Sequence, residues 1–171
     1  MVKIADALTF SRLLLMPVVA VLWLSTDSTV RWVGVLVFVV AGLTDIADGR
    51  IARRLNETTR FGSYVDPFAD KMLVLGSAAV LVSVHRLWLV WFVVVMAREM
   101  AVLTLRSVLK AGAEMPASPL AKVKTLSQMF AVGGAAVLTG PLPDGLLVLS
   151  GVLTVWTGIQ YLRHFWPSIQ T

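Results

Sequence analysis

Long apolar segments separated by short polar stretches set the pattern of this chain. A helix needs about 20 apolar residues to cross the hydrocarbon core of a bilayer, and six segments here have close to that length. Between them stand clusters of Gly, Pro, Ser, Asp or basic residues, which are typical of turns. We expect membrane helices at residues 8–24, 30–48, 62–84, 87–109, 120–138 and 146–162.

The composition agrees with this pattern. Hydrophobic residues make up 57% of the 171 residues and charged residues 15%. A soluble domain of this size has too little interior to bury so many apolar side chains. We therefore expect an all-α integral membrane protein with six transmembrane helices, forming a single domain over residues 1–171. The chain has no cysteine, which excludes disulfides and thiolate metal sites.

Basic residues are distributed unevenly between the two sides of the expected membrane protein. Most of the 15 Lys and Arg residues fall at helix ends and loops on the side of the N-terminus, whereas Arg31 and Arg86 fall on the other side. Cytoplasmic loops carry the excess of basic residues, so we expect a multi-pass protein of the cell inner (cytoplasmic) membrane with both termini in the cytoplasm. The net charge of +5 then reflects this bias and anionic lipid or substrate, and we expect no nucleic-acid partner.

Four aspartates lie close together between the second and third apolar segments. Asp45 and Asp48 are three residues apart and share one face of a helix, while Asp66 and Asp70 are four apart and share another. An arginine-rich stretch at residues 49–61 is expected to form a loop that reverses the chain. We expect the four carboxylates to converge on one polar cavity at the cytoplasmic side.

These carboxylates need cations, because clustered acids near the negative C-terminal end of a helix cannot all stay ionised without them. An all-oxygen set without His or Cys suits Mg²⁺ or Mn²⁺, and two ions would roughly neutralise four aspartates. Such ions commonly hold a diphosphate during phosphoryl transfer. The small residues Gly49, Ala52 and Gly62 would let a nucleotide base approach the backbone, although close helix packing is the better explanation of these residues taken alone.

Residues 45–70 follow the pattern Asp-x2-Asp-Gly-x2-Ala-Arg-x8-Gly-x3-Asp-x3-Asp. The pattern resembles the signature of the CDP-alcohol phosphotransferase family, and all eight specified positions are present. They are Asp45, Asp48, Gly49, Ala52, Arg53, Gly62, Asp66 and Asp70.

The resemblance implies a membrane enzyme that moves a phosphatidyl group from a CDP-linked lipid to an alcohol and releases CMP. It implies that the four aspartates surround two divalent ions and that Asp70 is the general base. It also suggests a homodimer. The cytidine nucleotide is expected near the residues matching Gly49, Ala52, Arg53 and Gly62.

Shorter stretches outside the signature are similar to the bacterial branch of this family that makes phosphatidylglycerophosphate. The similarity covers most of the chain, and it implies CDP-diacylglycerol as donor and the sn-1 hydroxyl of glycerol 3-phosphate as acceptor. The matching stretches are Thr9-Phe-Ser-Arg12, Thr59-Arg60-Phe-Gly62, Asp66-Pro-Phe-Ala-Asp70-Lys71, Ala97-Arg98-Glu99 and Lys122-Val-Lys124-Thr125.

The chain also carries more cations than one diphosphate needs. Arg98 lies inside an apolar segment, where a buried guanidinium needs an anion. Neighbouring helix residues point about 100° apart, so we favour a substrate phosphate over Glu99 as its partner. An acceptor that carries its own phosphate would use this surplus. The candidate acceptor-phosphate residues are Thr9, Arg12, Arg60, Arg98, Arg106, Lys122 and Lys124.

Three other functions stay open. A sister enzyme would use inositol phosphate or phosphatidylglycerol as acceptor, and only the resemblance separates it from the first reading. An intramembrane prenyltransferase would also use Asp-x-x-Asp with Mg²⁺, but the strict spacing of the small residues and Arg53 argues against it. A divalent-cation transporter would need acids along a path, whereas here they cluster at one side.

Overall fold

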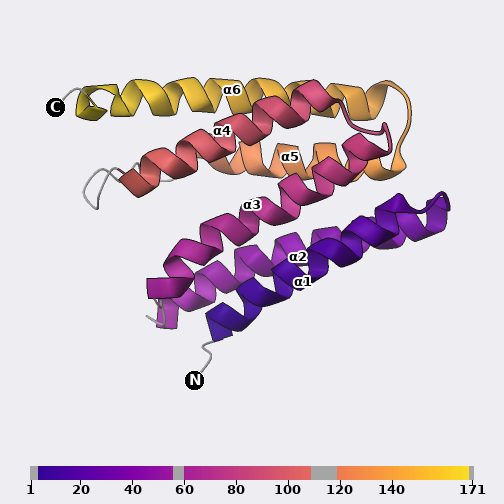
Figure 1. The fold of residues 1–171 in the computed structure, drawn as a ribbon, viewed down its shortest axis with the longest axis horizontal. Helices are drawn as coiled ribbons and strands as arrows, with labels where there is room; N and C mark the ends of the chain where they lie inside the picture. The colour runs from indigo at the N-terminus through magenta and orange to yellow at the C-terminus, as the bar shows by residue number, and fades with distance from the viewer. Residues whose placement is uncertain (1–3, 56–59, 109–118, 170–171) are drawn as a thin grey trace.

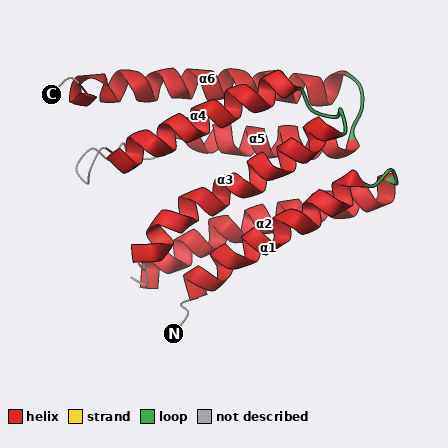
Figure 2. Ribbon diagram, viewed as in Figure 1, coloured by secondary structure: helices red, strands yellow, loops and turns green. Residues whose placement is uncertain are grey.

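The computed structural model describes the backbone of residues 4–55, 60–108 and 119–169, and the side chains of residues 13–44, 71–105, 120 and 122–164. Within these residues the chain forms six helices and no strand (Figure 2). The all-helical fold expected from the sequence is confirmed. The helices are α1 (Ile4–Leu24), α2 (Ser28–Leu55), α3 (Arg60–Ser83), α4 (Leu89–Val108), α5 (Pro119–Val137) and α6 (Pro141–Ile169).

Successive helices run in opposite directions, so the molecule has two distinct ends (Figure 1). Three short connections, at residues 25–27, 84–88 and 138–140, lie at one end. The end of α2, the start of α3, the end of α4 and both chain termini lie at the other. The residues of the family signature therefore belong to the end that also holds both termini.

Helix α2 is longer than the sequence pattern predicts. The expected loop began at Gly49, but α2 continues to Leu55 and places Ala52 and Arg53 on the helix. Arginine, alanine and leucine are strong helix formers, and one glycine costs only about 1 kcal/mol, so nothing in this stretch ends the helix. Much of the signature is thus carried on a helix and not in a loop.

Helix α6 also begins earlier than expected, because two prolines that suggested a turn lie in its first turn. Pro141 is its first residue and Pro143 follows two positions later. The first N–H groups of a helix have no partner within the helix, so proline loses nothing there. Gly140 precedes the helix with a φ of 92°, a conformation that glycine adopts without strain.

The core is formed where the helices face one another. Helix α1 packs on both α2 and α3, and α5 packs on α6. Trp23 of α1 is fully buried against Phe38 of α2, with ring centroids 5.3 Å apart. Gly34 makes room for this contact, because a Cβ there would come within 2.6 Å of the Trp23 ring. The two helices therefore approach closely at this point.

The outer surface is strongly apolar. Leu14, Val21, Val90 and Phe130 each expose more than two thirds of their surface, as do few side chains of this kind in soluble proteins. Within the described residues, Pro141–His164 is long and apolar enough to cross a membrane. Shorter apolar helical segments are Leu13–Leu24, Ser28–Thr44 and Lys71–Ser83. Both observations favour a membrane protein.

Candidate active site

The four aspartates of the signature lie on two helices. Asp45 and Asp48 belong to the second half of α2, and Asp66 and Asp70 belong to the first half of α3. These parts of α2 and α3 lie at the same end of the molecule (Figure 1). Their side chains are outside the described residues, so their convergence on one cavity stays a prediction.

Several other predicted site residues also have side chains outside the described part of the chain. Gly49, Ala52 and Arg53 belong to α2, and Arg106 belongs to the end of α4. Their roles stay predictions, as do those of Gly62, Arg60, Thr9 and Arg12.

The donor chemistry of the four aspartates fits the expected metal ions. They offer only carboxylate oxygens, the ligands that Mg²⁺ and Mn²⁺ prefer. Among the side chains that the structure describes, no group of three or more His, Cys, Asp or Glu residues comes together as a metal site. That Asp45, Asp48, Asp66 and Asp70 hold the expected ions stays a prediction.

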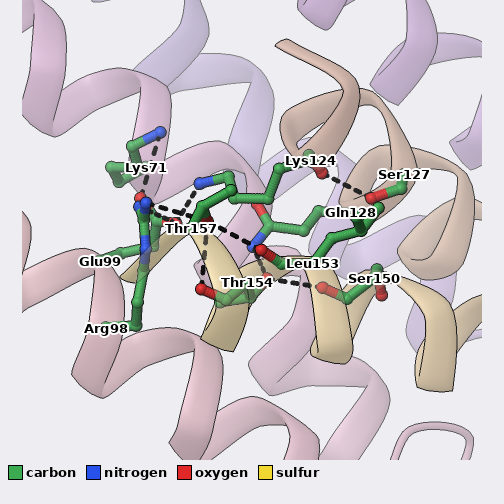
Figure 3. Close-up of polar contacts among 10 residues, drawn as sticks. All are labelled: Lys71, Arg98, Glu99, Lys124, Ser127, Gln128, Ser150, Leu153, Thr154 and Thr157. Atoms are coloured by element: carbon green, nitrogen blue, oxygen red, sulfur yellow. Dashed lines mark hydrogen bonds and ion pairs between the residues drawn. The ribbon is translucent and has the colours of Figure 1, made fainter. Parts of the chain in front are cut away.

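Among the described side chains, three cations from three helices meet one carboxylate (Figure 3). The carboxylate is Glu99 of α4. Its Oε2 is 3.4 Å from Nζ of Lys71, which follows Asp70 on α3. Its Oε1 accepts hydrogen bonds from Arg98 Nη1, at 3.0 Å, and from Lys124 Nζ of α5. We call these four residues the Glu99 cluster.

Burial differs between members of the Glu99 cluster. The side chains of Glu99 and Lys124 are 3% and 4% exposed, whereas those of Arg98 and Lys71 are 15% and 23% exposed. The carboxylate thus lies at the base of the cluster, and two of the cations reach toward its more open side. Among the described side chains, three positive groups thus face one negative group.

Two of the predicted acceptor-phosphate residues are brought together here, and a third is not. Arg98 and Lys124 share the Glu99 carboxylate. Lys122 is exposed, because it lies two residues before Lys124 and points from another face of α5. Whether any of them binds a phosphate stays a prediction.

The pairing of Arg98 with Glu99 differs from the sequence argument. Adjacent helix residues point about 100° apart, and that angle was expected to separate them. The long arginine side chain bridges the angle, and its Nη2 also donates to Thr157 Oγ1 of α6, at 3.2 Å. Its Nε is buried and has no hydrogen-bond partner among the described residues. The guanidinium is therefore hydrogen-bonded to residues of α4 and α6, and its Nε–H has no acceptor among the described residues.

The sequence argument did not predict that Glu99 gathers three cations. The signal was present in the sequence, because a glutamate among apolar residues of a helix needs buried partners. Glu99 was considered only as a possible partner of Arg98, so its need for further buried partners was overlooked. Lys71, also in the cluster, appeared only within a stretch that resembles the family.

A line of polar contacts continues from the cluster along α6 (Figure 3). Thr154, which is fully buried, accepts a hydrogen bond from Gln128 Nε2 of α5 at 2.9 Å. Ser150, one turn further, accepts a hydrogen bond from Trp91 Nε1 of α4 at 3.0 Å. Together with Thr157, these hydroxyls fix how α6 sits against α4 and α5.

Basic residues at the opposite end have a structural role. Arg86 Nη1 donates to the carbonyl of Ala136 at 3.1 Å, near the end of α5. Arg31 Nη1 donates to the carbonyls of Ser25 and Thr26 in the turn between α1 and α2. Burial lowers the pKa of Arg86, and the positive charge of Arg31 lowers it further. These cations hold backbone carbonyls at loops, away from the Glu99 cluster.

Comparison with known proteins points to one family along almost the whole chain. A protein named CDP-diacylglycerol–glycerol-3-phosphate 3-phosphatidyltransferase from Rickettsia typhi is 34% identical over 172 residues, covering 95% of this chain and 97% of its own length. Proteins of the same name are 31% identical in Bacillus subtilis, covering 100% and 99%, and 36% identical in Salmonella choleraesuis, covering 94% and 93%. The family model described as CDP-alcohol phosphatidyltransferase matches residues 2–157. The chain therefore belongs to the CDP-alcohol phosphatidyltransferase family.

Proposed function

We propose that this chain transfers the phosphatidyl group of CDP-diacylglycerol to the sn-1 hydroxyl of glycerol 3-phosphate, giving phosphatidylglycerophosphate and CMP. The names of the relatives support this reading along almost the whole chain. The structural observation that carries it is the Glu99 cluster, which gathers three cations around one carboxylate and includes Lys71, the residue after Asp70. An acceptor that bears a phosphate matches such a cluster better than a neutral alcohol does.

The proposed setting is the cell inner (cytoplasmic) membrane, with six spans and with both termini and the active site facing the cytoplasm. The alternating helices and the apolar outer surface support this topology. The excess of Lys and Arg at the end that holds the termini supports the orientation. Glycerol 3-phosphate and CMP are soluble, so a cytoplasmic site gives both of them free access.

In the proposed reaction Asp70 is the general base. Its carboxylate takes the proton of the acceptor hydroxyl, whose oxygen then forms a bond to the lipid-side phosphorus. The bond from that phosphorus to the CMP oxygen breaks, and CMP leaves with the electron pair. Two Mg²⁺ or Mn²⁺ ions, held by the four aspartates, would neutralise the charge of the diphosphate. Arg53 would stabilise the leaving CMP, and Gly49, Ala52 and Gly62 would leave room for the cytidine.

The phosphate of the acceptor is proposed to bind on the open side of the Glu99 cluster. Arg98 and Lys71 reach toward that side, and the more buried Lys124 is proposed to add its charge from behind them. Charged hydrogen bonds to a phosphate are about twice as strong as neutral ones. The remaining proposed contacts to this phosphate are Thr9, Arg12, Arg60, Arg106 and Lys122.

An acceptor panel tests the proposal. Purified protein with CDP-diacylglycerol and Mg²⁺ or Mn²⁺ is given glycerol 3-phosphate, inositol phosphate or phosphatidylglycerol, and CMP release is measured. We expect CMP release with glycerol 3-phosphate well above that with the other two. Release with inositol phosphate or phosphatidylglycerol alone would assign a sister activity, and no release with any alcohol would refute the reaction class. Light scattering of the same sample tests the proposed homodimer.

A further inference from the structure

We propose that Glu99 is a positioning residue for the acceptor phosphate. Its buried carboxylate holds Lys71, Arg98 and Lys124 in the arrangement that receives that phosphate, without touching the phosphate itself. The inference rests on the proposed function, because it concerns the acceptor of that reaction.

The two carboxylate oxygens of Glu99 contact cations on different helices. Oε2 faces Lys71 of α3, and Oε1 faces Arg98 of α4 and Lys124 of α5. One carboxylate therefore ties three helices together at the level of the signature. Without it, three cations would repel one another in a largely buried place, and each would move toward solvent or lose its charge.

The exposure of the side chains distinguishes the residue that positions the cations from the cations that meet the phosphate. Glu99 is 3% exposed and lies beneath the cations, whereas Lys71 is 23% exposed and Arg98 is 15% exposed. An incoming anion meets these cations first and has no reason to contact the carboxylate, which would repel it. Glu99 thus acts through the cations and is not a catalytic residue.

The position of Lys71 connects this cluster with the reacting hydroxyl. Lys71 directly follows Asp70 on α3, so Glu99 restrains the helix segment that carries the proposed base. In glycerol 3-phosphate the phosphate and the sn-1 hydroxyl are separated by a three-carbon chain. Holding the cations at a fixed place relative to Asp70 would therefore bring that hydroxyl to the base.

A merely structural role makes a different prediction. If Glu99 only stabilised the fold, its loss would lower the fraction of active protein and leave the KM values of that fraction unchanged. If it positions the cations, its loss selectively weakens binding of the acceptor. The KM for glycerol 3-phosphate and the inhibition by inorganic phosphate report this selectively.

The experiment compares full-length Glu99→Gln with wild type in vesicles containing CDP-diacylglycerol. We expect the KM for glycerol 3-phosphate to rise about tenfold or more, and inhibition by inorganic phosphate to weaken by a similar factor. The KM for CDP-diacylglycerol should change less than about threefold. Ser150→Ala is the matched control, because it removes a fully buried polar group bonded to Trp91, away from the cluster. It should lower Tm and leave both KM values unchanged.

An unchanged KM for glycerol 3-phosphate in Glu99→Gln, with a loss of Tm like that of Ser150→Ala, would overturn the positioning role. If Glu99→Gln does not fold, Glu99→Asp decides by the same comparison, since it keeps the charge but shortens the reach. A thermal-shift assay with inorganic phosphate separates this inference from the proposed function. If wild type releases no CMP, a rise in its Tm with phosphate that Glu99→Gln lacks supports the cluster as an anion site, and equal rises in both proteins refute it.

Discussion

The side chain of Arg98 lies directly against Gly158. A Cβ added at Gly158 would be 3.1 Å from Arg98 Cγ and 3.7 Å from its Nε. The missing side chain on α6 therefore leaves the space through which the guanidinium reaches Thr157 and Glu99. No sequence pattern indicates this role, because glycines in membrane helices usually serve helix packing.

Gly158→Ala should displace Arg98 without removing any charge. We expect the KM for glycerol 3-phosphate to rise a few-fold, roughly the effect of about 1 kcal/mol, while the KM for CDP-diacylglycerol stays unchanged. Steady-state CMP release at varied acceptor concentration measures this. Gly133→Ala is the control, because a Cβ there meets nothing within 4 Å. It should keep both KM values and raise Tm slightly, since alanine favours a helix over glycine.

Asp70→Asn tests the proposed base. An amide cannot take the proton of the acceptor hydroxyl, so kcat should fall by about 100-fold or more. The control is Asp144→Asn, because Asp144 is exposed in the first turn of α6 at the opposite end. Asp144→Asn should retain wild-type turnover. If Asp70→Asn kept most of its turnover, another group would have to be the base.

Removal of divalent ions tests the role of the four aspartates. Treatment with a chelator should abolish CMP release, and Mg²⁺ or Mn²⁺ should restore it, because nothing else would neutralise the diphosphate held beside four carboxylates. Ca²⁺ is a useful comparison, since it prefers longer bonds and more ligands. Full activity in the chelated protein would exclude a metal-dependent reaction.

Thr154→Val tests the contact between α5 and α6. It removes the acceptor of Gln128 Nε2 and leaves that buried amide unpaired, which should lower the free energy of unfolding by about 1–3 kcal/mol. Unfolding in detergent measures the loss. The double variant Gln128→Leu with Thr154→Val should recover part of it, because no buried donor is then left without a partner. Equal losses in the single and double variants would contradict this account.

The lengths and spacing of the apolar segments predicted the fold well, because each apolar segment corresponds to one helix. The six helices appear where the sequence pattern places them, and His85-Arg86 forms a tight connection as expected. The errors are at helix ends. Gly49 and Pro141 looked like breaks, yet one glycine is tolerated inside a helix and proline is favoured at its start.

The site was predictable in its residue types and less so in its contacts. Fixed spacing along α2 and α3 made Asp45 to Asp70 recognisable, because the pattern depends only on neighbours in sequence. The Glu99 cluster joins residues from α3, α4 and α5, and no local pattern reports which faces of three helices meet. The space that Gly158 of α6 leaves for Arg98 of α4 could not be predicted either, because it too depends on which helix faces meet.

The hydroxyls along α6 have a consequence for assembly of the helices. Ser150, Thr154 and Thr157 each donate to a carbonyl of α6 itself, on Leu147, Ser150 and Leu153. Helix α6 thus satisfies these donors before it meets any neighbour, and what it offers to α4 and α5 is acceptors. The dependence runs in one direction: Trp91, Arg98 and Gln128 need α6 to complete these hydrogen bonds, whereas the three hydroxyls of α6, which is synthesised after α4 and α5, already have acceptors within their own helix.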